Sequence, residues 1–157
     1  MEPTTLLELR HLLLDTRVLT VAVLVDGDPL AGLLPFLAEP DLQSVVVHTS
    51  RLARHSRGLA VGAPHSLVIH EPDRPEHDPM ALPRLIASGQ VEAVSDAARP
   101  ALQERWLARF ASARSTLPLG DFEFRRLRLE SARLILGFAQ AHGIGSETLA
   151  AAAELRP

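Results

Sequence analysis

The chain has 157 residues, of which 46% are hydrophobic and 22% charged, enough to form one domain, residues 1–157, around a substantial buried core. Cysteine is absent, which excludes a disulfide framework, a zinc–thiolate site and a cysteine nucleophile. The 16 basic residues are all arginine and are outnumbered by 19 acidic residues. The resulting net charge of -3 argues against a nucleic-acid-binding surface, which needs a basic excess.

The N-terminal segment, residues 1–16, is predicted to be a helix. Thr4 or Thr5 can cap it, and the leucines that follow recur at helical spacing. Charged side chains interrupt these leucines, which is wrong for a signal peptide, and no run of about twenty apolar residues occurs in the chain. We therefore expect a cytoplasmic protein that does not associate with membranes.

Residues 18–25 and 30–37 are predicted to form a β-hairpin. The first run is almost continuously apolar and β-branched, which is typical of a strand covered on both faces. The Asp-Gly pair at 26–27 is a strong hairpin signal, because glycine accepts the positive φ of a tight turn. In the second strand, Gly32 permits close backbone approach. Pro35 lacks a ladder donor and therefore indicates an edge or a bulge.

Residues 44–59 predict a strand that leads into a helix ending near Gly62. The β-branched run passes through His48, Thr49 and Ser50, and Ser50 is the expected helix N-cap. A helix N-terminus has unpaired N–H groups and the positive end of the helix dipole, both of which favour an anion. We therefore predict a phosphate site, the alternative being a capped surface helix with solvated arginines. The arginines expected to assist are Arg51, Arg54 and Arg57.

The remainder of the chain predicts four more strands and two helices. Gly89 suggests a bend in its strand. The change of alternation near Arg125 and Arg126 suggests a bulge or a shift from one environment to another. The proline-rich and charged segment 72–79 should be a loop. The elements together predict a mainly β, α+β fold: a six- to seven-stranded antiparallel barrel with flanking helices. The expected strands are 65–71, 82–94, 121–130 and 132–138, and the expected helices are 96–110 and 146–155.

Four sequence blocks, in this order, carry a resemblance to a known family. They are VDGDPLAGLLPF (25–36), TSRLARHSRGL (49–59), DPMALPRLIASGQVEAV (78–94) and GDFEFRRLRLESARLILGFAQA (120–141). They resemble the flavin-binding split barrels related to pyridoxamine 5'-phosphate oxidase, especially the haem-utilisation branch. The resemblance spans nearly the whole chain. It implies a homodimer that encloses two FMN molecules at its interface and acts on a small-molecule substrate.

The resemblance also implies which residues bind FMN. Residues 32–37 would follow the flavin ring with their backbone groups, and His48 and Thr49 would lie near the ribityl chain and phosphate. Arg54 and His55 would hold the phosphate. The cofactor-binding residues are then Gly32, Leu33, Leu34, Pro35, Phe36, His48, Thr49, Ser50, Arg54, His55 and Arg84, and no catalytic residue is identified.

The chain departs from the family pattern at three places. Glycine stands at position 32 where serine is frequent and at position 58 where asparagine is frequent, and Leu30 replaces a frequent aromatic residue. The C-terminal segment also lacks the arginine-rich sequence that holds the pyridoxal substrate in the oxidases. We therefore do not expect pyridoxamine 5'-phosphate oxidase activity and leave the substrate open.

The histidines offer little support for a metal site. His65, His70 and His77 match no standard ligand spacing, so no metal is expected. His142 is the best haem-ligand candidate, its alternative being a solvated side chain. Three hypotheses remain: an FMN-dependent oxidoreductase, a non-catalytic haem or flavin binding protein on the same barrel, and an empty barrel kept as a dimeric interaction module. Haem and deazaflavin are the alternatives to FMN as the ligand.

Overall fold

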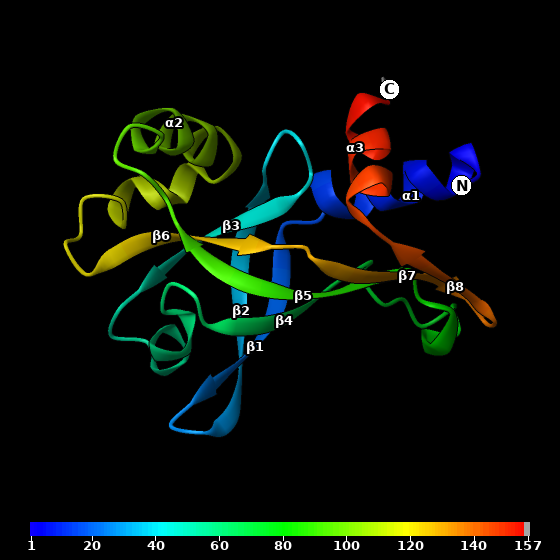
Figure 1. The fold of residues 1–157 in the computed structure, drawn as a ribbon, viewed down its shortest axis with the longest axis horizontal. Coiled ribbons are helices and arrows are strands. Elements are labelled where there is room, and N and C mark those ends of the chain that lie inside the picture. Colours follow the sequence, from blue (N-terminus) through cyan, green and yellow to red (C-terminus); the bar gives the residue numbers. More distant parts are fainter. Residues whose placement is uncertain (156–157) are drawn as a thin grey trace.

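The computed structural model describes residues 1–155, which form a closed antiparallel β-barrel with flanking helices (Figure 1). None of the helices in this range combines the length and the hydropathy that a membrane span requires. The helices are α1 (Pro3–Leu14), α2 (Arg99–Arg109) and α3 (Ser146–Glu154), with short 3-10 helices η1 (Arg54–Leu59), η2 (Pro79–Ala81) and η3 (Ala111–Ser115). The strands are β1 (Val18–Val25), β2 (Asp28–Ala38), β3 (Ser44–Ser50), β4 (Pro64–His70), β5 (Arg84–Ala93), β6 (Phe122–Arg128), β7 (Ser131–Gly137) and β8 (Gln140–Ile144).

Six strands close the barrel in the order β4-β1-β2-β3-β6-β5, because β5 pairs back onto β4. β5 changes partner along its length: residues 84–88 pair with β7 and residues 91–93 pair with β6. Gly89 lies between these two segments, where a Cβ atom would collide with the carbonyl oxygen of Arg128. Only glycine permits the close approach that lets β7 and β8 leave the barrel as an extension. The predicted split barrel is confirmed, with β8 as an additional strand.

The β1–β2 hairpin turns as the sequence predicts. Asp26 and Gly27 have φ values of 55° and 88°, the positive values that a tight hairpin turn requires. β1 faces the core with alternate residues only, and Val18 and Leu24 on its outer side are 46% and 54% exposed. The prediction that β1 is covered on both faces is therefore wrong for the described single chain.

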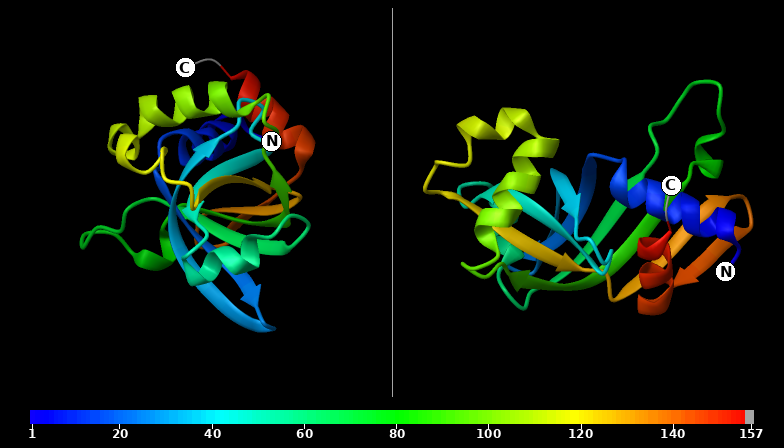
Figure 2. Two further views of the ribbon diagram at one scale, coloured as in Figure 1. Left: turned by 90° about the vertical axis from the view of Figure 1, so that its left-hand side faces the viewer. Right: turned by 90° about the horizontal axis from the view of Figure 1, so that it is seen from above.

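Two apolar clusters hold the structure together. The larger fills the barrel and extends to α1 and α3, which pack near one end with Leu9 and Leu149 fully buried. The smaller lies under α2, where Trp106 packs against Val46 of β3 and Phe124 of β6. Figure 2 shows α2 and α1 at opposite ends of the barrel. The second cluster is therefore separate from the barrel interior.

Several local predictions are wrong for identifiable reasons. α1 begins at Pro3, with Glu2 as its N-cap, so neither threonine caps it. β6 pairs with β3 without a register shift, so no bulge forms near Arg125 and Arg126. The alternative, a shift of environment, is confirmed, because Phe124 packs in the cluster under α2 whereas Leu127 packs in the barrel cluster. The polar side chains there are accommodated by ion pairs instead, from Arg125 to Glu123 and from Arg126 to Glu39.

Candidate cofactor-binding pocket

The candidate site lies where β2 and β3 separate. Residues 36–38 of β2 pair with residues 45–47 of β3. Away from this short ladder, β2 pairs with β1 along residues 28–35, while β3 stays paired with β6 as far as Ser50. Pro35 stands at the start of the separation, where its missing N–H removes no β2–β3 bond. The prediction that Pro35 marks an edge is confirmed, and the edge opens into a pocket.

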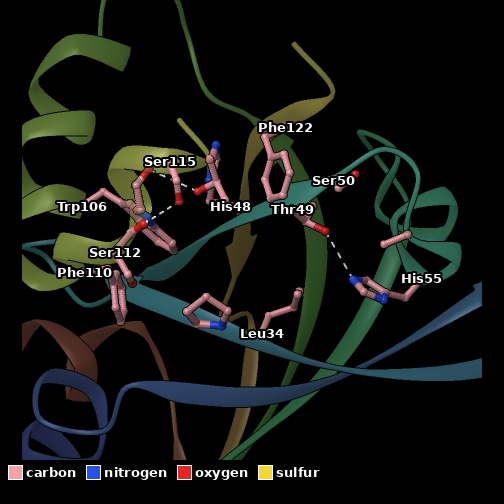
Figure 3. A pocket seen from close by; sticks show the side chains of 14 residues that line it. Leu34, His48, Thr49, Ser50, His55, Trp106, Phe110, Ser112, Ser115 and Phe122 are labelled. Carbon is pink, nitrogen blue, oxygen red and sulfur yellow. Dashed lines mark hydrogen bonds between the residues drawn. The ribbon is translucent and has the colours of Figure 1, made fainter. Parts of the chain in front are cut away.

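The pocket has a volume of about 570 Å³, within the usual range for small-molecule and cofactor sites (Figure 3). One wall comes from β2 and β3, and the other from α2, η3 and the start of β6. Within residues 1–155, none of the lining residues is aspartate, glutamate, lysine or arginine. The lining residues are Leu34, Pro35, His48, Thr49, Ser50, Ala53, His55, Trp106, Phe110, Ser112, Ala113, Ser115, Thr116 and Phe122.

His48 lies in the aromatic part of the pocket. Its ring centroid is 4.4 Å from that of Phe124, 5.1 Å from that of Phe122 and 5.8 Å from that of Trp106. The residue is only 7% exposed, and this burial lowers the pKa of His48 to about 4. The imidazole is therefore neutral at pH 7.

Polar side chains of β3 and η1 form a hydrogen-bonded group on another side of the pocket (Figure 3). Thr49 Oγ1 lies 3.3 Å from His55 Nε2, the contact drawn in Figure 3. Thr49 Oγ1 also lies 2.7 Å from the Oγ atom of Ser56, which does not line the pocket. The His55 ring packs over Gly32, where a Cβ atom would be 2.9 Å from His55 Cγ. The glycine therefore leaves room for this ring position, and burial lowers the pKa of His55.

The predicted helix start at Ser50 is wrong. The helix that follows β3 is η1, which has six residues, begins at Arg54 and has Ala53 as its N-cap without a side-chain hydrogen bond. Ser50 instead accepts a hydrogen bond from the backbone N–H of Leu52 and donates one to the carboxylate of Asp121. Because Asp121 is 71 residues away in sequence, the local pattern contains no sign of this contact.

The three arginines predicted to surround an anion do not line the pocket. Arg51 donates to the carbonyl oxygen of Gly120 at 2.7 Å, and Arg57 forms an ion pair with Asp26 at 2.9 Å. Arg54 is exposed and does not line the pocket. The expected cradle of three guanidiniums is therefore not formed in this structure.

Of the predicted cofactor-binding residues, the structure brings six to the pocket: Leu34, Pro35, His48, Thr49, Ser50 and His55. The others lie apart from its lining. Phe36 is fully buried in the barrel, and Leu33 is 68% exposed beside a different cavity. Gly32 lies beneath His55, and Arg84 donates to the carbonyl oxygen of Leu82 at 2.8 Å.

The opposite wall of the pocket was not predicted as part of a site. The four-residue spacing of Trp106 and Phe110 predicts core packing, and both are indeed buried, yet both also face the pocket. The hydroxyl residues that join them carry no sequence signal that distinguishes them from a loop. They are Ser112, Ser115 and Thr116.

Positive charge lies behind the aromatic wall. The guanidinium carbons of Arg17 and Arg109 are 5.2 and 5.7 Å from the centroid of the Phe110 ring. Burial and the neighbouring Arg17 charge lower the pKa of Arg109, and its Nε atom is buried with no hydrogen-bond partner among residues 1–155. These two cations flank the pocket without lining it.

Comparison with known proteins supports the fold. No protein-family model and no curated protein matches the sequence. A heme binding protein from Mycobacterium smegmatis is 28% identical, with a TM-score of 0.83 over 96% of this chain, which spans 62% of that protein. HutZ, the heme storage protein from Vibrio cholerae, is 24% identical, with a TM-score of 0.69 and coverage of 83% of this chain and 92% of HutZ.

A protein described as binding both FAD and heme, also from Mycobacterium smegmatis, is 22% identical. Its TM-score is 0.65, and the match covers 91% of this chain and 76% of that protein. At this identity, as for HutZ, the likeness supports the fold alone. The closed six-stranded barrel and these neighbours agree with the four sequence blocks. The chain has the split β-barrel fold that the resemblance to the relatives of pyridoxamine 5'-phosphate oxidase implies.

Proposed function

We propose that this chain is a haem-binding protein that carries or stores haem in the pocket between β2, β3 and η3. The observation that carries the proposal is a mainly apolar pocket of about 570 Å³ with aromatic walls, a buried neutral imidazole and no charged lining residue. A porphyrin ring is large, flat and apolar, so aromatic walls suit it, and a neutral imidazole is a common ligand of haem iron. The residues present therefore fit haem.

The charge distribution favours haem over FMN. The phosphate of FMN needs cations or several N–H donors beside it, and neither a charged side chain nor a helix start of useful length faces the pocket. Haem propionates can remain at a pocket mouth in contact with water. Arg17 and Arg109, whose guanidinium groups pack on the Phe110 ring, would attract the propionates at this side of the pocket.

The pocket offers little acid–base chemistry from its own side chains. Among residues 1–155, His48 and His55 are its only titratable lining side chains, and burial lowers the pKa of both. A general acid or base works best with a pKa close to the ambient pH, and for His48 the pKa is about 4. Haem bound here would supply its own redox chemistry, while the chain would hold and shield it. The heme binding protein from Mycobacterium smegmatis is consistent with this proposal.

A homodimer belongs to the same proposal. Val18 and Leu24 on β1 and Leu33 on β2 are large apolar residues exposed on the outer side of the barrel wall. A second copy of the chain would cover this surface, as the family resemblance implies. Sedimentation of the purified protein gives the oligomeric state directly.

FMN-dependent oxidoreductase activity is the second candidate. It is favoured by the hydrogen-bonded group of Thr49, His55 and Ser56, which offers polar contacts to a phosphate, and by exposed Arg54 beside it. A deazaflavin phosphate would use the same contacts. In this candidate the substrate is a small molecule that neither the pocket nor the sequence identifies.

Parallel titrations test the two candidates. Purified protein is titrated with hemin, followed by the Soret band, and separately with FMN, followed by quenching of flavin fluorescence. The haem proposal predicts a saturable Soret shift and FMN binding at least tenfold weaker. Tight FMN binding with no specific hemin spectrum would reverse the assignment, and binding of neither would favour the empty interaction module.

A further inference from the structure

The arrangement around His48 points to a specific role for this residue. We propose that His48 is the side chain that coordinates the haem iron, an inference that rests on the proposed haem-binding function. His48 follows Val47, the last β3 residue that pairs with β2, so its side chain stands where the two strands have separated. Figure 3 shows the ring among the side chains that line the pocket.

His48 is buried, but its ring remains accessible from the pocket. It is 7% exposed and makes no side-chain hydrogen bond within residues 1–155. His65 is the useful contrast, because both of its ring nitrogens are completely buried and unpartnered, while no His48 atom has that status. A ring nitrogen of His48 therefore reaches the pocket, where a ligand can satisfy it. A buried polar group without a partner is otherwise unfavourable.

The neighbouring aromatic rings hold the imidazole in place. Phe122, Phe124 and Trp106 surround it at centroid distances between 4.4 and 5.8 Å. Packing of this kind restricts the rotamers of the ring and preorganises it to bind. Iron in a porphyrin is commonly coordinated by a neutral imidazole nitrogen, and His48 offers such a nitrogen, fixed in apolar surroundings.

Other possible iron ligands are less well placed. The lining contains no cysteine, methionine or tyrosine, and its only other histidine, His55, already contacts Thr49 and packs over Gly32. His142, the ligand that the sequence suggests, lies on β8 and does not line the pocket. His48 is therefore the residue that the geometry selects.

Hemin titration of histidine variants tests the proposal. His48→Phe keeps an aromatic ring within the cluster but removes the nitrogen, so hemin affinity should fall at least tenfold and the Soret band should move toward that of weakly associated hemin. His48→Gly should behave similarly, and added imidazole should restore the wild-type band by occupying the vacated space. His65→Phe and His142→Ala should keep the wild-type spectrum and affinity.

The thermal midpoints of the apo variants establish that each is folded. If His48→Phe is unfolded, His48→Met serves instead, since a thioether ligand should retain hemin with an altered spectrum. Wild-type affinity and spectrum in His48→Phe, with loss in His142→Ala, would overturn the role of His48 while leaving haem binding intact. Absence of specific hemin binding by the wild-type protein would overturn the proposed function, and the role of His48 with it.

Discussion

The barrel interior and the pocket beside it are built from different residues. The interior is filled by apolar side chains such as Phe36, Leu67 and Leu85. The pocket places His48 and Thr49 among aromatic rings and adds hydroxyl groups from η3. Buried polar groups are destabilising unless they are paired, and the pocket gathers several of them beside an open cavity, where a ligand could pair with them. The interior therefore provides stability, and the role proposed for the pocket is recognition of a ligand.

The largest expected effect is the loss of stability when a side chain in the barrel interior is removed. Phe36 is fully buried, so Phe36→Ala should lower the free energy of unfolding by about 3 to 5 kcal/mol through lost burial and the cavity left behind. Leu52→Ala is the control, because Leu52 is 86% exposed and its loss should change stability by less than about 0.5 kcal/mol. Urea denaturation measures both. Equal losses in the two variants would contradict the assignment of stability to the interior.

The second prediction concerns the pocket, where the buried His48 should make the stability of the protein depend on acidic pH. The pKa of His48 is lowered to about 4 in the folded protein, so between about pH 6.5 and 4 the unfolded chain binds more protons. The free energy of unfolding is therefore unaffected by the titration of His48 above about pH 6.5. It falls by roughly 3 kcal/mol as the pH drops from there to the pKa of about 4. Burial also lowers the pKa of His55 and His65, which adds to the effect in the same direction.

His48→Phe should remove part of this acid sensitivity. The measurement is the free energy of unfolding of the apo protein at pH 7 and at pH 4.5, for the wild type and the variant. The difference between the two pH values should be smaller in the variant. If both proteins lose the same amount, His48 is not a significant source of acid lability.

The third prediction concerns the attachment of the pocket wall to the barrel. Arg105 of α2 contacts Glu39 at 2.7 Å and donates to the carbonyl oxygen of Ala38 at 2.8 Å, and Glu39 also pairs with Arg126 of β6 at 2.9 Å. Although burial opposes its charge, the bonds from Arg105 and Arg126 lower the pKa of Glu39 overall. α2 is thus joined to the barrel by charge as well as by packing.

Glu39→Gln should lower the free energy of unfolding by about 2 kcal/mol, because two partly buried guanidiniums lose their carboxylate. It should also weaken hemin binding several-fold by loosening the wall that carries Trp106. Asp96→Asn is the control, since its pair with Arg99 is exposed and should contribute little. Unchanged hemin affinity in Glu39→Gln would separate the ion-pair network from the pocket.

The sequence predicts the barrel better than the pocket because the signals for the barrel are local. The Asp-Gly turn and the β-branched runs define the β1–β2 hairpin, and four ordered blocks indicate the split barrel. β8 was not predicted, because the sequence QAHGI has little apolar alternation and only Ile144 is buried. A strand of this kind is formed by pairing with β7 and not by its own composition.

The pocket depends on contacts between distant segments. Ser50 hydrogen-bonds to Asp121 and does not cap a helix as predicted. The aromatic rings around His48 belong to residues more than fifty positions later in the sequence. Nothing near residue 50 in the sequence records either contact. The predicted phosphate cradle rested on local helix chemistry, whereas the structure uses strand separation to make the opening.

The smallest expected effect comes from the positive charge behind the pocket. If haem propionates lie toward Arg17, then Arg17→Ala should weaken hemin binding two- to fivefold, a modest loss because exposed ion pairs typically contribute less than about 1 kcal/mol. The loss should shrink at high salt, which screens exposed charges. Arg133→Ala, an exposed arginine on β7, is the matched control and should bind hemin as the wild type does. If the loss of hemin affinity in Arg17→Ala does not change with salt, the loss comes from missing packing on Phe110. The comparison of low and high salt therefore separates electrostatic attraction from support of the aromatic wall.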